Sequence, residues 1–143
     1  MNGIIEEATI VTRALIPENQ RLTHTANLFG AHFPLQLEPV IYGITDRMAE
    51  AYSGGYWNFC SLDNDGFYMA PENDRVFTVS CDNYWTGELS AGALGVVACL
   101  YTYSHCSFSR NERFARLCAE HYHLLREYMF EHEEVHSILG AID

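Results

Sequence analysis

The chain has 143 residues, of which 48% are hydrophobic and 13% aromatic, a composition that excludes a disordered protein and favours a single globular domain over residues 1–143. Its formal net charge is −11, because 19 acidic residues face only 8 basic ones, all of them arginine. Such a charge disfavours strong direct binding to nucleic acid, whose phosphates would be repelled. It suits either simple solubility or attraction to a basic partner surface.

The cysteines and the apolar runs indicate the cellular compartment of the protein. There are five cysteines, an odd number with no short paired spacing, which predicts reduced thiols that serve as buried apolar side chains. The sequence begins without a basic region followed by an apolar core, so we expect no secretory signal and a cytoplasmic protein. The longest apolar run, residues 91–101, has about half of the ~20 residues of a membrane span, so no membrane contact is expected.

The first predicted elements are a short extended segment and two helices. Residues 9–16 are compatible with a strand or a helix, and their β-branched content favours the strand. A helix is predicted after Pro17, with Leu22 and Phe29 on its inner side and Gly30 at its end. A second helix is predicted from Glu38-Pro39, because proline is tolerated in a first helical turn.

The most informative segment, residues 52–71, predicts a β-hairpin of two aromatic strands. Gly54-Gly55 ends the preceding helix, and the sequence Asp-Asn-Asp-Gly at 63–66 supplies turn residues that tolerate positive φ. The alternating residues 75–81 predict a third strand, and a turn at Asp82-Asn83 leads to a fourth at residues 84–86. We therefore expect a small antiparallel meander of about four strands.

Three helices are predicted after the sheet. Ser90 can cap the first, in which Ala91, Gly95 and Cys99 form a stripe of small residues at four-residue spacing. Glycine within a helix costs up to ~1 kcal/mol, so the stripe indicates close packing against the sheet or another helix.

The last two helices complete the predicted fold. Residues 109–112 read as a capping box, with Ser109 as the cap of a long helix, and residues 133–134 begin a short final helix. The predicted fold class is therefore α+β, a small antiparallel sheet flanked by N-terminal and C-terminal helices.

Two short motifs suggest metal binding, and neither has the right context. Residues 132–136 match His-Glu-x-x-His, which places two zinc ligands on one helical face, with His121 or His123 available to complete a site. Too little sequence follows for a substrate cleft, so incidental surface histidines are favoured. Residues 61–72 match part of a calcium loop, and a hairpin turn explains the same residues. We therefore expect no metal, no cofactor and no catalytic residues.

The hairpin also carries a resemblance. A Gly-Gly-Tyr-Trp strand at 54–57 paired with Gly-Phe-Tyr-Met-Ala-Pro at 66–71 resembles the signature of the ArdB/KlcA antirestriction family. Other segments are similar to the family in the same order, namely Leu-Ile-Pro-Glu at 15–18, Gly-Glu-Leu-Ser-Ala at 87–91, His-Tyr-His-Leu-Leu-Arg at 121–126 and Ala-Ile-Asp at 141–143. The chain departs from the family pattern at Gly92, Cys99 and Cys106, which affects packing more than surface chemistry.

The resemblance implies a function without catalysis. It implies inhibition of the host's type I restriction–modification systems, which protects incoming plasmid or phage DNA, through direct or indirect protein contacts with that machinery. A regulatory module of a mobile element without antirestriction activity is the alternative, and a homodimer stays open. DNA mimicry is disfavoured, because a duplex presents about one charge per 1.7 Å and the carboxylates here lie singly or in pairs.

Five residues are the candidate partner contacts: Arg21, Trp57, Tyr68, Trp85 and Asp143. Aromatic residues and arginine are the usual energetic anchors of interfaces, and the three aromatic candidates lie in or next to the predicted sheet. Arg21 and Asp143 match the N-terminal arginine and the terminal residue of the family. Core packing is the alternative for the aromatic rings, an internal ion pair for Arg21, and simple solvation for Asp143.

Overall fold

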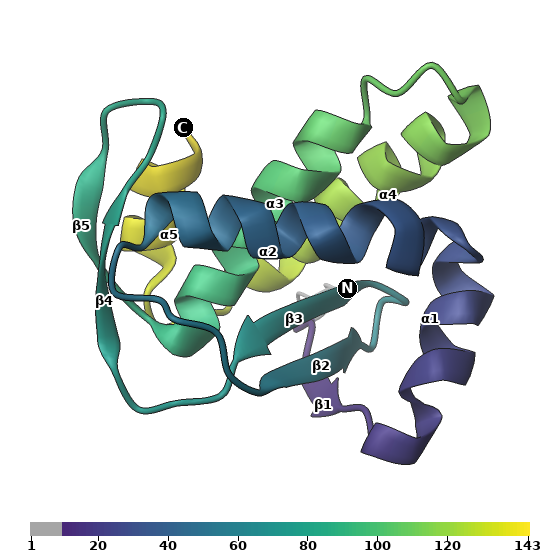
Figure 1. Ribbon diagram of the computed structural model, residues 1–143, viewed down its shortest axis with the longest axis horizontal. Helices are drawn as coiled ribbons and strands as arrows, with labels where there is room; N and C mark the ends of the chain where they lie inside the picture. The colour runs from purple at the N-terminus through teal and green to yellow at the C-terminus, as the bar shows by residue number, and fades with distance from the viewer. Residues whose placement is uncertain (1–9) are drawn as a thin grey trace, which may run out of the picture.

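The structure is a computed structural model that describes residues 10–143. It confirms the predicted α+β class (Figure 1). The elements follow one another in the order β1 (Arg13–Leu15), η1 (Glu18–Gln20), α1 (Arg21–Phe29), η2 (Phe33–Leu37), α2 (Glu38–Met48), β2 (Trp57–Leu62), β3 (Phe67–Pro71), β4 (Val76–Ser80), β5 (Thr86–Ser90), α3 (Ala91–Cys106), α4 (Glu112–Met129) and α5 (Val135–Ile142).

The strands form two antiparallel sheets instead of the single meander that the sequence suggested. One sheet has the order β1-β2-β3, and the other is the β4-β5 hairpin alone. β1 confirms the strand expected in the first segment, as far as the described residues reach. The predicted fourth strand begins later, at Thr86, because residues 82–85 belong to the turn. The β4-β5 hairpin lies at one end of the molecule and the β2-β3 hairpin nearer its middle, with α2 running past both (Figure 1).

The predicted hairpin over residues 52–71 is confirmed as β2 and β3. Phe59 lies opposite Met69 and Cys60 opposite Tyr68 in the register. One face of the sheet packs on the N-terminal helices, where the rings of Phe59 and Phe67 meet edge to face with centroids 5.7 Å apart. The opposite face carries Cys60 and Tyr68, whose side chains share one side because directly paired residues of an antiparallel sheet do so.

The N-terminal helices differ from the prediction in one respect. α1 ends at Gly30, which has a φ of 59°, as its position after Phe29 predicted. Leu22 is 87% exposed, so its predicted inward orientation is wrong. The helix begins at Arg21, which puts Leu22 in the first turn, and Thr25 and Phe29, four residues apart, form the buried side instead. A π-helical segment, η2, then continues directly into α2 (Figure 1).

Helix α3 covers the outer edge of β3, one of the two edge strands of the three-stranded sheet. The Cys99 thiol donates to the carbonyl oxygen of Met69 and accepts from its N–H, both at 3.5 Å. One turn further on, the Tyr103 hydroxyl donates to the carbonyl oxygen of Phe67 at 2.8 Å. One turn earlier, Gly95 lies so close that an added Cβ would be 2.5 Å from the Met69 oxygen. The predicted small-residue stripe is therefore the surface that packs on the sheet.

The caps of the C-terminal helices agree only in part with the prediction. Ser90 caps α3, because its hydroxyl accepts from the Ala93 N–H at 3.2 Å. The cap of α4 is Asn111, whose side chain accepts from the Phe114 N–H at 3.1 Å, and the predicted cap Ser109 instead accepts from the Asn111 N–H. Both residue types favour this position, so the local sequence did not decide between them.

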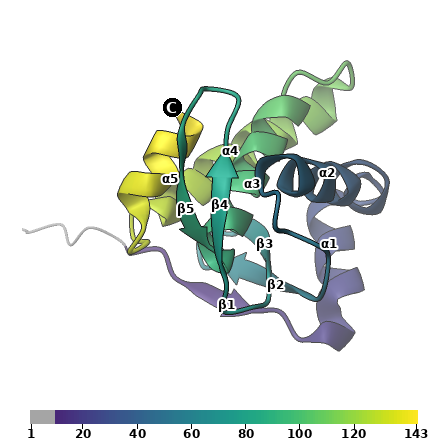
Figure 2. The same cartoon turned by 60° about the vertical axis from the view of Figure 1, so that its left-hand side comes forward.

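The far end of the molecule is built by α5 and the β4-β5 hairpin. They pack beside each other next to the C-terminus, while α1 lies at the opposite end (Figure 2). The Tyr101 hydroxyl of α3 donates to the carbonyl oxygen of Ala141 at 2.5 Å and so joins α5 to the central helix. None of the helices formed by residues 10–143 is long and apolar enough to span a bilayer.

The contact between α3 and β3 gives a testable pair of glycine substitutions. Gly95→Ala would force a methyl group against Ala70 and Met69, and overpacking of this kind costs about 1–3 kcal/mol. In Gly92→Ala, in the first turn of the same helix, the added Cβ meets nothing nearer than the Ser90 hydroxyl at 4.0 Å. Urea denaturation should show a clear loss of unfolding free energy for Gly95→Ala and none for Gly92→Ala. Equal stability of the two variants would contradict the close contact.

Candidate functional site

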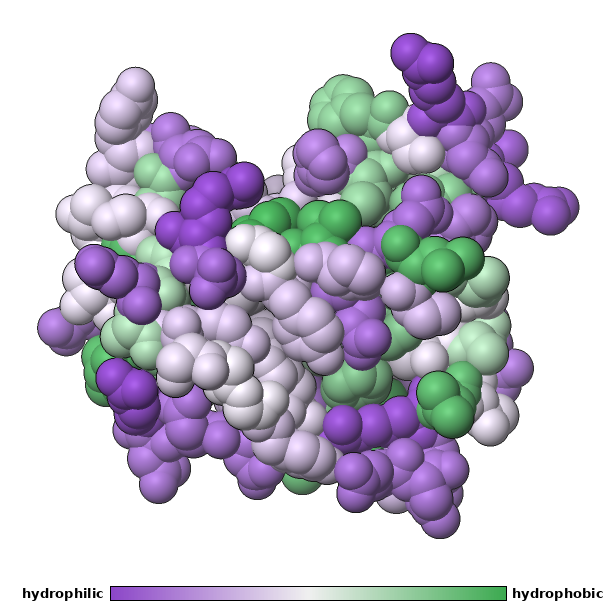
Figure 3. Space-filling model, viewed as in Figure 1, coloured by the Kyte–Doolittle hydropathy of each residue, from purple (hydrophilic) through white to green (hydrophobic). Residues whose placement is uncertain are grey.

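The exposed surface of residues 10–143 contains scattered apolar side chains. Figure 3 shows hydrophobic groups in separate spots on one face, several of them near the N-terminal helices, with hydrophilic groups between them. The large exposed hydrophobic residues are Ile10, Leu15, Leu22, Leu35, Tyr56, Val76, Tyr84, Phe108 and Phe130. Single apolar residues of this kind are normal on protein surfaces, so a binding role for any of them needs further support.

Arg21, a predicted partner contact, joins helix α1 to the start of β2. Its Nη2 donates to the Tyr56 hydroxyl at 2.7 Å and to the Trp57 carbonyl oxygen at 2.8 Å. The guanidinium carbon also lies 4.4 Å from the centroid of the Phe59 ring, within the range of a cation–π contact. Arg21 thus makes hydrogen bonds and aromatic contacts within the domain, and its contact with a partner stays a prediction.

Trp57 and Tyr68, two of the predicted aromatic contacts, are buried to 4% and 3% exposure. The Trp57 Nε1–H donates to the Tyr52 hydroxyl at 2.9 Å, and its ring meets the Tyr42 ring edge to face. The Tyr68 ring stacks on the Tyr128 ring with centroids 5.4 Å apart. A partner could reach either ring fully only by breaking these internal contacts, and a binding role for both residues stays a prediction.

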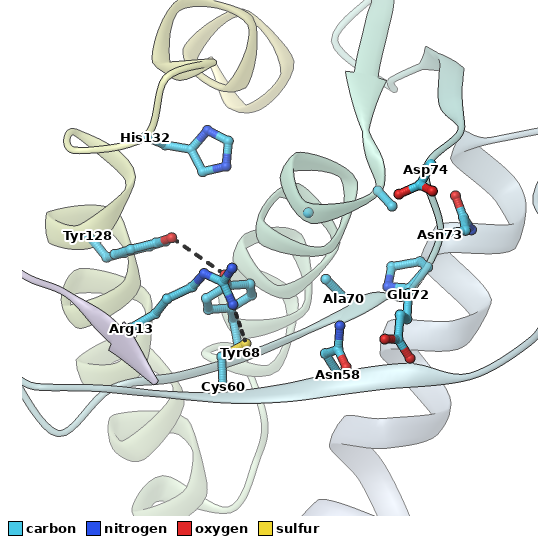
Figure 4. Close-up of a pocket in the computed structure, with 13 residues that line it drawn as sticks. Arg13, Asn58, Cys60, Tyr68, Ala70, Glu72, Asn73, Asp74, Tyr128 and His132 are labelled. Carbon is cyan, nitrogen blue, oxygen red and sulfur yellow. Dashed lines mark hydrogen bonds between the residues drawn. The ribbon is translucent and has the colours of Figure 1, made fainter. Parts of the chain in front are cut away.

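Tyr68 also forms part of a polar cavity of about 520 Å³ on the outer face of the three-stranded sheet (Figure 4). The labelled side chains place Tyr128, His132 and Arg13 on one side of the cavity and Glu72 and Asp74 on the other. The Arg13 guanidinium donates to the Cys60 sulfur at 3.7 Å.

The Cys60 thiol and the Tyr68 hydroxyl of this cavity are not activated as nucleophiles. Burial raises the pKa of the Cys60 thiol, and it raises the pKa of the Tyr68 hydroxyl far above its ordinary value. Both groups therefore stay protonated at neutral pH, whereas an active nucleophile or general base requires the opposite shift.

The two histidines of the His-Glu-x-x-His motif do not lie on one helix, because α5 begins only at Val135. His132 lies in the turn before α5, and its Nδ1 accepts from the Glu134 N–H at 3.0 Å. The Glu134 carboxylate in turn accepts from the N–H and hydroxyl of Ser90, at 2.9 and 2.5 Å. His121 is buried between the rings of Phe29 and Tyr103. Across residues 10–143, no three His, Cys, Asp or Glu side chains gather in a metal-binding arrangement.

The calcium-like residues 63–66 make a hairpin turn that is tied to other elements. The Asp63 carboxylate accepts from the N–H and the hydroxyl of Thr12, both at 3.0 Å. The Asn64 amide donates to the Leu124 carbonyl oxygen at 2.9 Å, which fixes the turn to α4. These polar groups hold β1, the hairpin and α4 together, as the turn interpretation of the sequence requires.

Trp85 and Asp143, the other two predicted contacts, lie at the same end of the molecule. Trp85 is half-buried, and its indole lies so close to Gly87 and Gly140 that an added Cβ on either residue would overlap the ring. The Asn83 amide donates to the carbonyl oxygens of Gly140 and Ala141, at 3.0 and 3.2 Å. Asp143 is exposed two residues beyond this anchor. We call the surface formed by residues 82–85 and Asp143 the hairpin-tip surface.

Sequence reasoning missed Asn83 and Tyr84 in this surface. Asparagine two residues before Trp85 is a signal for a local turn, because its side chain accepts from the Trp85 N–H at 3.0 Å. Its second contact, with α5, could not be foreseen, since it depends on the packing of segments 57 residues apart. The exposure of Tyr84 gives no sequence signal, because tyrosine in a strand-rich segment is usually half-buried.

The fold and these contacts define a small α+β protein. Among its described residues, His132 and Glu134 of the His-Glu-x-x-His segment and Asp63 of the calcium-like segment make structural contacts. A sequence profile described as "Antirestriction protein" matches residues 50–143. The chain belongs to this antirestriction protein family.

Individual relatives match over almost the whole chain. Antirestriction protein KlcA of Escherichia coli is 36% identical over an alignment of length 143, and the alignment covers 97% of this chain and 97% of KlcA. The uncharacterized protein YafX of Escherichia coli strain K12 is 42% identical over 133 residues, covering 90% of this chain and 85% of YafX. A solved structure of the KlcA and ArdB group, 34% identical, superposes over 100% of both chains with a TM-score of 0.87. KlcA and ArdB are described as a novel fold with antirestriction activity against type I DNA restriction systems in vivo but not in vitro.

The buried His121 makes a testable prediction about acid stability. Burial lowers its pKa to about 4 in the folded protein, against about 6.5 in the unfolded chain. As the pH falls from 6.5 to 4, the unfolded chain binds a proton that the folded protein does not, so the folded state should lose up to about 3 kcal/mol. In His121→Phe this part of the pH dependence should vanish.

The measurement is the unfolding free energy of each protein at several pH values between 4 and 7. His105→Phe, at an exposed position, is the matched control and should keep the steeper acid loss of the parent chain. If His121→Phe lost stability with acid as steeply as the parent, His121 would not be a buried neutral histidine.

Proposed function

We propose that this protein inhibits type I restriction–modification systems inside the host cell and so protects incoming plasmid or phage DNA. The observation that carries this proposal is the structural match to the KlcA and ArdB group over the full length of both chains, at 34% identity. The match includes the sheets, the buried central helix and the C-terminal end, so it supports a shared function better than a shared motif would. Cytoplasmic action follows from this proposal, because restriction takes place there.

Inhibition by protein contact, without catalysis, is the mechanism that the described residues support. The Cys60 and Tyr68 groups of the polar cavity are held protonated, and Glu134, which follows the glutamate of the His-Glu-x-x-His segment, accepts from the N–H of Ser90 at the start of α3. KlcA and ArdB act in vivo but not in vitro, which is the behaviour expected when a contact needs a host component that a purified assay lacks. The proposed partner is therefore the type I machinery, reached directly or through such a component.

The hairpin-tip surface is the part of the molecule that we assign to this contact. This surface contains Trp85 and Asp143, and Asn83 bonds it to α5, so it keeps its shape without a partner. The other predicted contacts, Arg21, Trp57 and Tyr68, hold the frame together through internal bonds. Direct binding to nucleic acid is not part of the proposal, since a charge of −11 repels phosphates.

The proposal predicts that expression of the protein restores plating of unmodified phage on cells with an active type I system. Methylation of the surviving phage genomes should stay low, because protection by blocked cleavage does not require modification. Cells that lack the restriction system serve as the control, and their plating should not change. Continued restriction in cells that contain soluble, folded protein would contradict the proposal and favour a regulatory role in a mobile element.

A further inference from the structure

Tyr84 has a backbone conformation that a bulky residue rarely adopts. Its φ is 70°, in the left-handed region that favours glycine and, to a lesser degree, asparagine and aspartate. The other described residues with positive φ are Asp65 and the glycines Gly30, Gly54 and Gly55. Tyr84 is therefore the one bulky side chain among residues 10–143 that is held in this unfavourable conformation.

The turn that imposes this conformation is fixed on both sides. The Tyr84 N–H donates to the Cys81 carbonyl oxygen at 3.0 Å, and the Cys81 N–H donates to the Trp85 carbonyl oxygen at 2.9 Å. Asn83 ties the same turn to the end of α5, and the Trp85 indole fits against Gly87 and Gly140. The backbone at position 84 is thus determined by its neighbours and not by its own side chain.

The Tyr84 side chain itself contributes almost nothing to folding. It is 95% exposed, the largest exposure among the large hydrophobic residues, so its ring lies in solvent at the tip of the hairpin. Figures 1 and 2 both show this tip projecting beside the C-terminus. Glycine or asparagine would suit the same turn with less strain and without an exposed ring. Strain that folding does not need is typical of functional positions.

We infer that Tyr84 is the anchor of a protein interface and that it inserts into an apolar slot of a partner protein. Tyrosine is a frequent interface anchor because it combines a large apolar ring with little conformational freedom to lose. A fixed turn adds to this advantage, since no loop has to be ordered upon binding. This inference rests on the proposed function, and it names the residue through which the hairpin-tip surface would act.

The charges around Tyr84 indicate the rim of the partner's slot. Asp82 lies in the same turn as Tyr84. Asp143 follows the α5 residues whose carbonyl oxygens accept from Asn83 of that turn, and both aspartate side chains are exposed. The chain as a whole carries −11. A complementary partner surface would surround its apolar slot with arginine or lysine, which also speeds association through long-range attraction.

The test is the protection of unmodified phage against a type I system by the full chain and three variants. Tyr84→Gly should unfold at the same or a higher temperature than the parent, because the strain is removed, and should lose at least about tenfold in protection. Tyr84→Phe keeps the ring and should protect as well as the parent. Phe108→Ala removes another exposed aromatic ring, 86% exposed at the turn between α3 and α4, and should also protect normally.

The outcomes separate the two proposals. If the parent chain failed to protect, both the proposed function and this inference would be wrong. Protection by the parent together with equal protection by Tyr84→Gly would overturn the inference and leave the function standing. A lowered unfolding temperature of Tyr84→Gly would show that the ring stabilises the fold and would overturn the inference as well. Loss of protection in Tyr84→Phe would contradict an apolar slot, because only the hydroxyl is removed.

Discussion

The rest of the structure depends on the contact between helix α3 and the edge of strand β3. An edge strand presents unpaired N–H and carbonyl groups, which are a site for unwanted pairing. Here Gly95 allows the helix to approach the backbone, and Cys99 and Tyr103 satisfy its polar groups. These three residues are four apart, so they form one line along the helix. Because α2, α4 and α5 all pack on α3, the position of α3 on the sheet sets the positions of these three helices.

The packing of the helices around α3 also fixes the exposed turn that carries Tyr84. Polar side chains that resemble catalytic or metal-binding groups are used to join elements, as Glu134 does at the start of α3 and Asp63 does between the turn and β1. The far end of α3 is joined to α5 through Tyr101, and α5 holds the turn that carries Tyr84. A chain of defined contacts therefore runs from the sheet to an exposed aromatic residue. Such an arrangement suits the inhibition by contact that we propose, in which a fixed shape meets a partner.

The sequence predicted those features that depend on neighbouring residues. The hairpin, the Ser90 cap and the stripe of small residues in α3 follow from turn chemistry and helical spacing, and the structure confirms them. The division into two sheets could not be predicted, because it depends on how distant hairpins pack. The exposure of Leu22 was missed because α1 begins later than its proline suggests. The conformation of Tyr84 was missed because distant contacts impose it against the residue's own preference.

The central structural claim, that α3 closes the edge of β3, is tested most directly by native-state hydrogen exchange at the Met69 amide. This amide points away from β2 and is covered by the Cys99 sulfur. We predict that it exchanges as slowly as the amides that bond β3 to β2, with a protection free energy close to that of global unfolding. Exchange at the rate of an exposed edge amide, while the rest of the sheet stays protected, would show that the helix does not close the edge.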